Sequence, residues 1–178
     1  MTAFRQMIDA DRQFVVSTWS SSYRTSPYAG MLAMDTYADV MHREIDRILD
    51  HPSTRTIVAD EPGETDHEGR PFLYGFVCVR DLDVAVARLT LRASAAAADD
   101  CGPVRANPYV YYVYVKRPYR RGLHNGLPQA MGTELFRAAG VDPRRPFEYG
   151  CHTSYCSQLS RKIPRAQFNP LPARYLTS

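Results

Sequence analysis

The chain has 178 residues, enough for one domain that buries a substantial core without disulfide or metal cross-links. Hydrophobic residues make up 44% of it and charged residues 23%, ordinary globular values that argue against a disordered protein. The net charge is only +3, but from Tyr109 onward eleven Lys and Arg stand against three acids, so residues 109–178 carry +8 and residues 1–108 carry −5. A basic half suits a phosphate-bearing cofactor or nucleic acid, with a solvated basic surface as the simpler alternative.

Signals for export, membrane insertion and metal binding are missing from the sequence. No apolar run approaches the ~20 residues of a membrane-spanning helix, and the first residues, MTAFRQMIDADR, lack a signal-peptide pattern. The cysteines form no C-x-x-C pair and so indicate neither a zinc ribbon nor a redox motif; they are Cys78, Cys101, Cys151 and Cys156. We therefore expect one cytoplasmic domain over residues 1–178, with no membrane association, no metal site and buried or free thiols.

Two helices are predicted before the first strand. Residues 10–23 place Phe14 and Trp19 on one side of a helix. Residues 35–49 carry an apolar stripe at helical spacing, and Asp35 stands where an N-cap is expected.

A β-hairpin is predicted next. Residues 54–59 and 72–80 are rich in β-forming residues, and the polar segment between them, EPGETDHEGRP, has the composition of a hairpin loop. Residues 84–91 fit either a strand or a short helix. The Ala-rich segment after them, ASAAAADDCGP, is typical of a surface connection.

The most informative segment is residues 109–131, YVYYVYVKRPYRRGLHNGLPQAM. Its first seven residues are only Tyr and Val, which is typical of an inner strand covered on both faces. A cationic turn follows, in which Pro118 ends strand pairing and Gly122 and Gly126 allow unusual backbone angles. Apolar residues then recur at helical spacing over residues 127–138.

This strand, turn and helix predict an anion site. A helix begins with unpaired N–H groups and with the positive end of its dipole. We therefore expect the amides of the cationic turn to be unpaired in the protein and directed at the oxygens of a ligand such as a pyrophosphate. The simpler alternative is a solvated basic turn without a ligand.

The remaining elements are a strand at 147–151, a helix at 153–163 and a Pro-interrupted edge segment at 166–176. Four segments resemble the GCN5-related N-acetyltransferase (GNAT) superfamily, in the version often encoded by phages: FVVSTWSSSYRTSPYAG, FLYGFVCV, YVYYVYVKRPYRR and HTSYCSQLSRKIPRAQFNPLPARY. The resemblance covers most of the chain. It implies an α/β (α+β) fold, with a central mixed, mostly antiparallel twisted sheet of about six or seven strands and helices on both faces, in a bacterial or phage-infected cell.

In that superfamily an acyl-coenzyme A lies where the central strand splays from its neighbour, and its pyrophosphate sits on the following loop. The resemblance thus implies acetyl-coenzyme A or another acyl-coenzyme A, held by Tyr114, Val115, Arg120, Arg121, Gly122, Leu123, His124, Asn125 and Gly126. The loop departs from the family motif R/Q-x-x-G-x-G/A. With Arg120 at its first position, Leu123 and Asn125 take the places of the two small residues.

Catalytic residues are expected on the helix after the next strand. Many family members carry there a Tyr that protonates the leaving thiolate, and Ser160 occupies that position. Tyr155 lies about one turn earlier, and His152 can accept a proton from an attacking amine. A cap or loop role is the alternative for His152, and the alternative for Tyr155 is that its side chain faces elsewhere.

The substrate side is expected at the loop between the first two helices, where the resemblance implies Ser22, Tyr23 and Arg24, with a solvated loop as the alternative. Tyr112 belongs to the same set, because tyrosine hydroxyls alternate along the central strand and one face can line a pocket. Packing with the hydroxyls at the sheet margin is the alternative.

These features predict an acyltransferase in which an amine of a small molecule, peptide or protein attacks the acyl thioester directly. One alternative resembles Mom, the phage Mu protein that modifies adenine in DNA without ordinary acetyl-coenzyme A chemistry. Nucleic acid would then contact the basic C-terminal half, in which basic and aromatic residues interleave: Arg161, Lys162, Arg165, Phe168, Arg174 and Tyr175. A catalytically silent binding protein on the same scaffold is the third alternative.

Overall fold

The computed structural model describes residues 2–26, 30–31, 33–81, 108–120, 131–151, 163 and 165–168. In chain order the elements are β1 (Ala3–Gln6), α1 (Asp9–Ser21), the 3-10 helix η1 (Ser22–Thr25), α2 (Met34–Leu49), β2 (Thr54–Thr65), β3 (Pro71–Arg80), β4 (Tyr109–Val115), the 3-10 helix η2 (Arg117–Tyr119), α4 (Met131–Ala138), β5 (Phe147–Tyr149) and β6 (Ala166–Phe168).

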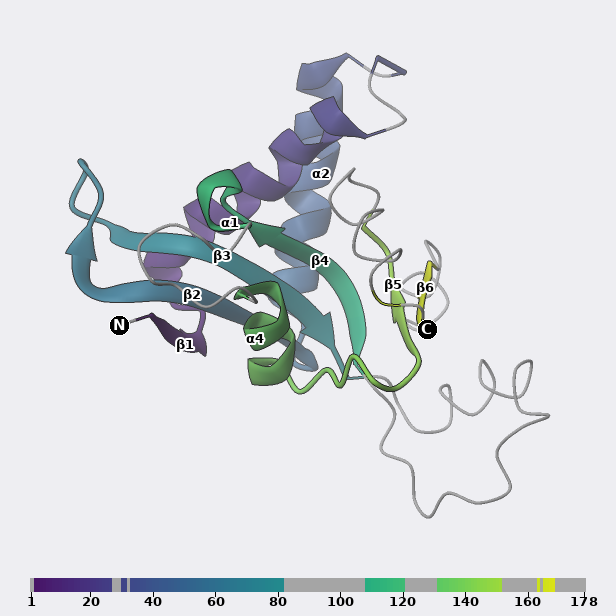
Figure 1. Ribbon diagram of the computed structural model, residues 1–178. Coiled ribbons are helices and arrows are strands. Elements are labelled where there is room, and N and C mark those ends of the chain that lie inside the picture. Colours follow the sequence, from purple (N-terminus) through teal and green to yellow (C-terminus); the bar gives the residue numbers. More distant parts are fainter. Residues whose placement is uncertain are drawn as a thin grey trace.

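Six strands form one sheet in the order β1-β2-β3-β4-β5-β6. The first four are antiparallel neighbours, whereas β5 runs parallel to β4 and β6 parallel to β5. The sheet is twisted, with α1 and α2 on one face and α4 on the other (Figure 1). The predicted fold class, a mixed and mostly antiparallel sheet with helices on both faces, is confirmed. That residues 1–178 make a single domain stays a prediction.

β3 and β4 form the centre of the core. Residues 73–80 of β3 are all buried, and β4 is buried at every position except Tyr114. Because both faces of these strands are covered, they consist of apolar and aromatic residues without strict alternation. The prediction of an inner strand at residues 109–115 is confirmed.

α1 and α2 confirm the two predicted N-terminal helices, with differences at their ends. α1 gives way to η1 at Ser22, whose Oγ donates to the Trp19 carbonyl at 2.6 Å. Such side-chain bonds compete with the helical backbone pattern. α2 has Ala33 as its N-cap, so the prediction that Asp35 is the N-cap is wrong. Asp35 lies in the first turn, where its charge faces the positive end of the helix dipole.

The predicted hairpin is confirmed, but its strands run further than predicted. β2 ends at Thr65 and β3 starts at Pro71, and these two residues are paired. Asp66 closes the short turn between them: Oδ1 accepts from the amides of Glu68 and Arg70 at 2.9 and 3.0 Å. An Asp that binds backbone N–H groups in this way stabilises a turn, and the polar end of β2 therefore remains paired.

No sequence pattern predicted β1, which pairs with β2. Its Arg5 lies between two buried carboxylates, with Nη1 donating to Asp11 Oδ2 and Nε donating to Asp60 Oδ2, both at 2.6 Å. Asp11 is 1% exposed and Asp60 is 7% exposed. Because buried charges are stable only when paired, Arg5 fixes β1 to both α1 and β2.

Several predicted elements lie wholly or partly outside the described residues. These are the segment 84–91 with the connection after it, the beginning of the helix 127–138, and the helix 153–163 except its last residue, which is a bend. The strand predicted at 147–151 is confirmed as β5 over three residues. Of the edge segment predicted at 166–176, the first three residues form β6, the last strand of the described sheet, and residues 169–176 lie outside the described residues.

The two described cysteines differ in state. Cys78 in β3 is buried and free, as predicted. Cys151, just after β5, is 6% exposed and disulfide-bonded. The prediction of free thiols is therefore wrong for Cys151, because spacing in the sequence does not show which cysteines meet in the fold.

Candidate functional site

The central strand carries a β-bulge at Tyr111. Where β3 advances by one residue, from Cys78 to Val79, β4 advances by two, so Tyr111 has no residue opposite it. A bulge bends its strand and increases the local twist. The side chain of the bulged residue is fixed, because Arg80 Nη1 donates to the Tyr111 hydroxyl at 3.3 Å.

Arg80 also ties the bulge to the end of α2. It is 8% exposed; its Nη2 donates to His51 Nε2 at 2.9 Å and its Nε donates to Ser53 Oγ at 3.2 Å. Because an arginine only donates, His51 Nε2 must accept, and the imidazole is neutral. Desolvation and the charges of Arg80 and Arg47 lower the pKa of His51, which agrees with this state.

β4 and β5 meet at a single register position within the described residues. Val110 pairs with Tyr149, and the Gly150 amide donates to the Val110 carbonyl at 2.9 Å. β4 continues beyond this point to Val115, while β5 does not follow it (Figure 1). Residues 111–115, roughly 16 Å of strand at ~3.3 Å per residue, therefore have no described strand beside them on that edge.

Alternation of the backbone decides which groups face this edge. The Lys116 amide donates to the Tyr74 carbonyl of β3 at 2.8 Å, so alternate residues before Lys116 also direct their N–H and C=O groups to β3. Val113 and Val115, which lie between them, direct theirs to the opposite side. The N–H groups of these two valines are therefore donors aimed at the space from which β5 has parted.

The cationic turn after β4 is closed in its described part. The amides of Lys116, Tyr119 and Arg120 donate to backbone carbonyls of the protein at 2.8, 2.9 and 3.3 Å. Pro118 lies within η2, the 3-10 turn that uses the last two of these bonds. The prediction that the amides of the turn are unpaired is wrong for these three residues. The rest of the predicted loop lies outside the described residues: Arg121, Gly122, Leu123, His124, Asn125 and Gly126.

Arg120, predicted to hold the phosphates of a cofactor, folds back on β4. Its Nε donates to the Val115 carbonyl at 2.6 Å, and its guanidinium carbon lies 5.5 Å from the centroid of the Tyr114 ring, within the range of a cation–π contact. Arg120 is nevertheless exposed. The structure thus brings Tyr114, Val115 and Arg120 together at the end of the parted edge.

Tyr112 and Ser22, both predicted on the substrate side, lie together inside the protein. The Tyr112 ring stacks on Trp19, with 5.0 Å between centroids and 15° between planes, and Tyr112 is 3% exposed. The Ser22 hydroxyl donates its single proton to the Trp19 carbonyl, so in its hydrogen bond with Tyr112 it accepts from the Tyr112 hydroxyl. Burial raises the pKa of Tyr112 to about 12. The protonated hydroxyl therefore holds η1 against β4.

The other predicted site residues are not brought to this edge by the described structure. Arg24 is exposed in η1, and the side chain of Tyr23 lies outside the described part. The same is true of the three candidate catalytic residues, His152, Tyr155 and Ser160. Their roles stay predictions.

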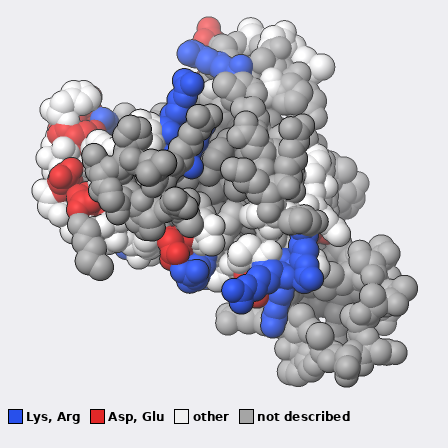
Figure 2. Space-filling model, in the orientation of Figure 1, with Lys and Arg blue, Asp and Glu red and all other residues white. Residues whose placement is uncertain are grey.

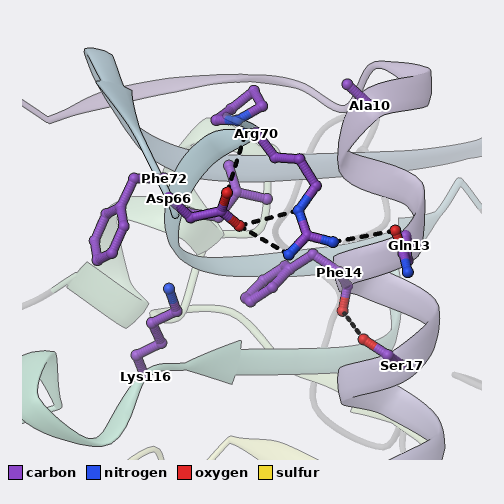
Figure 3. Close-up of a pocket in the computed structure, with 10 residues that line it drawn as sticks. Ala10, Gln13, Phe14, Ser17, Asp66, Arg70, Phe72 and Lys116 are labelled. Carbon is purple, nitrogen blue, oxygen red and sulfur yellow. Dashed lines mark hydrogen bonds and ion pairs between the residues drawn. The ribbon is translucent and has the colours of Figure 1, made fainter. Parts of the chain in front are cut away.

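A pocket of about 130 Å³ lies beside the end of β4, between α1 and the β2–β3 turn (Figure 3). Its walls include Gln13 and Phe14 of α1, Asp66 of the turn, Phe72 of β3, and Lys116. Sequence reasoning missed this pocket, since it counted Lys116 only as one of the cations of the turn. No local pattern could have found it, because its walls come from three segments far apart in the chain.

The described helices include none long and apolar enough to cross a membrane. Within the same part of the chain, no group of three His, Cys, Asp or Glu is placed to hold a metal ion.

Comparison with models of protein families finds no match, and neither does comparison with curated proteins. Several solved structures are similar to this chain, and three of them are described here. A predicted acetyltransferase of Pyrococcus furiosus is 13% identical over 95% of this chain and 82% of its own, with a TM-score of 0.49. A predicted GNAT-family acetyltransferase of Desulfovibrio desulfuricans is 18% identical over 79% and 69%, with a TM-score of 0.37.

The third is the ribosomal-protein-alanine N-acetyltransferase of Brucella melitensis biovar Abortus 2308, 14% identical over 98% of this chain and 84% of its own, with a TM-score of 0.41.

Proposed function

We propose that the protein is an acyltransferase of the GNAT type, which transfers an acyl group from acyl-coenzyme A to an amine. One observation carries the proposal: the parallel strands β4 and β5 part after Val110, beside the bulge at Tyr111, and the amides of Val113 and Val115 face the parted side. A strand edge without a neighbouring strand can recognise an extended ligand through its backbone groups.

The end of the edge supports a ligand that carries phosphates. Arg117 and Arg120 are exposed there, and a guanidinium group binds phosphate through two parallel N–H donors. The Arg120 guanidinium already lies against the last residues of β4, so a ligand along the edge would meet it at one end.

The coenzyme would supply an activated thioester. The amides of Val113 and Val115 would hold the ligand in line with the strand and donate to the acyl oxygen, where negative charge develops during attack by the amine. For the proton transfers we retain the predicted roles: His152 accepts a proton from the amine, and Tyr155 or Ser160 donates one to the thiolate.

Turnover and ligand binding test the proposal together. Purified protein is incubated with acetyl-coenzyme A and a panel of polyamines, amino-acid amides and short peptides, and thiol release and acetylated product are measured by absorbance and mass spectrometry. We expect amine-dependent thiol release. We also expect acetyl-coenzyme A to stabilise the protein against thermal unfolding. A ligand present at 100 times its Kd increases the free energy of unfolding by about 2.7 kcal/mol. No product with any amine, and no stabilisation at millimolar coenzyme, would contradict the proposal.

A second candidate function, binding and modification of nucleic acid, is supported by a basic surface. Arg144 and Arg145 precede β5 and Arg165 precedes β6; all three are exposed, and Arg165 Nη1 donates to the Arg144 carbonyl. Figure 2 shows Lys and Arg side chains gathered in groups on this face, whereas the acidic side chains at the left lie over the β2–β3 hairpin. Converging cations of this kind favour a polyanionic partner.

Salt dependence separates this candidate from the first. Binding of the protein to duplex and single-stranded DNA is measured at 50 and 200 mM salt, with the three arginines intact and with all three changed to Gln. The nucleic-acid function predicts binding that weakens at least tenfold over this range and weakens again in the variant. It also predicts a mass shift on adenine in DNA from expressing cells. Absence of binding at 50 mM salt would reject it.

A further inference from the structure

The pocket beside β4 holds a lysine in an unusual setting (Figure 3). Lys116 directly follows β4 and is half-buried. Its Nζ lies 4.0 Å from the centroid of the Phe72 ring and 5.3 Å from that of Phe14. Both distances are within the range of cation–π contacts, so two aromatic faces hold the amine at the pocket.

The Lys116 amine has no hydrogen-bond acceptor or ion-pair partner in the part of the chain that the structure describes. The nearby Asp66 carboxylate is engaged by Arg70, with Nη2 of Arg70 2.9 Å from Oδ2, and Gln13 Oε1 accepts from Arg70 Nη1 at 3.2 Å. The amine is therefore left with aromatic neighbours on one side and the pocket on the other.

Burial, the neighbouring charges and the two rings all affect how much of Lys116 is neutral, and the cation–π contacts favour the ammonium form. The hairpin contributes Asp66, Glu68 and Arg70, of which Arg70 pairs with both carboxylates, and α1 contributes the neutral Gln13. Burial lowers the pKa of Lys116 and the charge of Asp66 opposes this. Asp66 itself stays ionised, because burial opposes its ionisation but Arg70 and backbone amides together lower its pKa to about 2.

The scarcity of lysine in the chain makes Lys116 unusual. Of the 22 Lys and Arg residues in the chain, only Lys116 and Lys162 are lysines. An arginine cannot lose its proton in a protein, whereas a partly desolvated lysine can become a nucleophile. The pocket thus contains one of the two side chains of the protein that can supply a nucleophilic amine.

We propose that Lys116 is a site of covalent acylation, at which the pocket receives a short acyl group from a thioester. Nζ, after loss of one proton to solvent, attacks the carbonyl carbon. The C–N bond forms, the C–S bond breaks, and the electron pair leaves with the thiolate, while Nζ releases its second proton as the amide forms. The pocket, of about 130 Å³, accommodates the acyl group. The site does not depend on the proposed function; only the identity of the cellular acyl donor does.

A donor without coenzyme A tests the site independently of the proposed function. Native protein is treated with limiting S-phenyl thioacetate from pH 6.5 to 9.5, and acetylation of Lys116 is quantified by peptide mass spectrometry. N-acetyl-lysine methylamide in the same tube serves as the reference amine. We expect Lys116 to react faster than the reference at pH 7.5, because a lowered pKa leaves more of the amine neutral. A rate equal to or below the reference would overturn the proposal.

A charge variant tests whether the pocket sets this reactivity. Asp66→Asn keeps an acceptor for the turn amides but removes the negative charge that opposes deprotonation of Lys116, so its Lys116 should react faster than that of the wild type. Glu44→Gln is the matched control, because it removes the same charge from an exposed pair with Arg47 on α2. Equal rates in the two variants would show that the pocket does not control the amine, and would also overturn the proposal.

Discussion

The Gly150 amide donates to the carbonyl of Val110 at 2.9 Å, next to the single register pair that joins β5 to β4 in the described structure. The bulge at Tyr111 follows at once. A bulge bends and twists its strand, and this bulge lies where the pairing of β4 with β5 ends. The candidate site begins at this point of β4.

The close approach of β3 to β4 at the site leaves no room for a side chain at Gly75. A Cβ there would lie 2.3 Å from the Tyr114 carbonyl oxygen and 3.0 Å from the Val115 Cα, and backbone atoms cannot move aside easily. We expect Gly75→Ala to lower the free energy of unfolding by about 2–3 kcal/mol. Gly63→Ala is the control, because its Cβ meets nothing within 4 Å and only its φ of +85° opposes the change. Urea unfolding measures both, and an equal loss in the two variants would contradict the prediction.

Arg120 should contribute to coenzyme binding more than to stability. Its exposed guanidinium lies at the end of the parted edge, and a charge-assisted hydrogen bond contributes about 1.5–3 kcal/mol, so Arg120→Ala should weaken acetyl-coenzyme A binding by ~10-fold or more. Arg137→Ala is the control, since Arg137 pairs with Glu134 on the exposed side of α4. Calorimetric titration gives both affinities. Equal affinities for the two variants would remove Arg120 from the proposed site.

His51 should make stability fall in mild acid. Its pKa is lowered in the folded protein by desolvation and by Arg80 and Arg47, so the unfolded state binds the proton more readily. The free energy of unfolding should therefore be highest above the ordinary histidine pKa of about 6.5 and should decrease as pH falls through the lower folded value. His51→Gln, which keeps an acceptor for Arg80, should flatten this decrease between pH 7 and 5 in urea unfolding. An unchanged slope would show that His51 is not responsible.

Cys78 should be inert in the folded protein. It is fully buried, and burial raises the pKa of its thiol to about 12, while a hydrogen bond with Thr56 opposes this. Only the thiolate reacts with alkylating agents. We expect iodoacetamide at pH 8 to leave Cys78 unmodified in native protein and to modify it in 6 M guanidinium, as read by peptide mass spectrometry. Rapid labelling of Cys78 in the native state would contradict its placement in β3.

The parts of the fold predicted from sequence are those with a strong local pattern. The Tyr/Val run from Tyr109 to Val115 and the apolar stripe of α2 each determine an element by themselves. β1 was not predicted because its four residues show no clear alternation. It forms by pairing with the distant strand β2, and Arg5 holds it there through Asp11 and Asp60. The full length of β2 was not predicted, because Asp66 closes a turn inside a segment with loop composition.

The candidate site, too, was predicted only where the sequence has a strong local pattern. The sequence located the strand and its cationic turn, and Tyr114, Val115 and Arg120 do lie together. It could not show that the first amides of the turn bond to protein carbonyls, since this depends on the 3-10 geometry of η2. The bulge at Tyr111 and the pocket at Lys116 were also inaccessible, because each is defined by register or packing between distant segments.

Amide hydrogen exchange along β4, followed by NMR with and without saturating acetyl-coenzyme A, tests the central claim most directly. If the coenzyme lies along the parted edge, exchange at Val113 and Val115 should slow at least tenfold, while Tyr112 and Tyr114, whose amides face β3, should change little. Unchanged exchange at both valines with millimolar coenzyme present would contradict the claim that this edge is a ligand site.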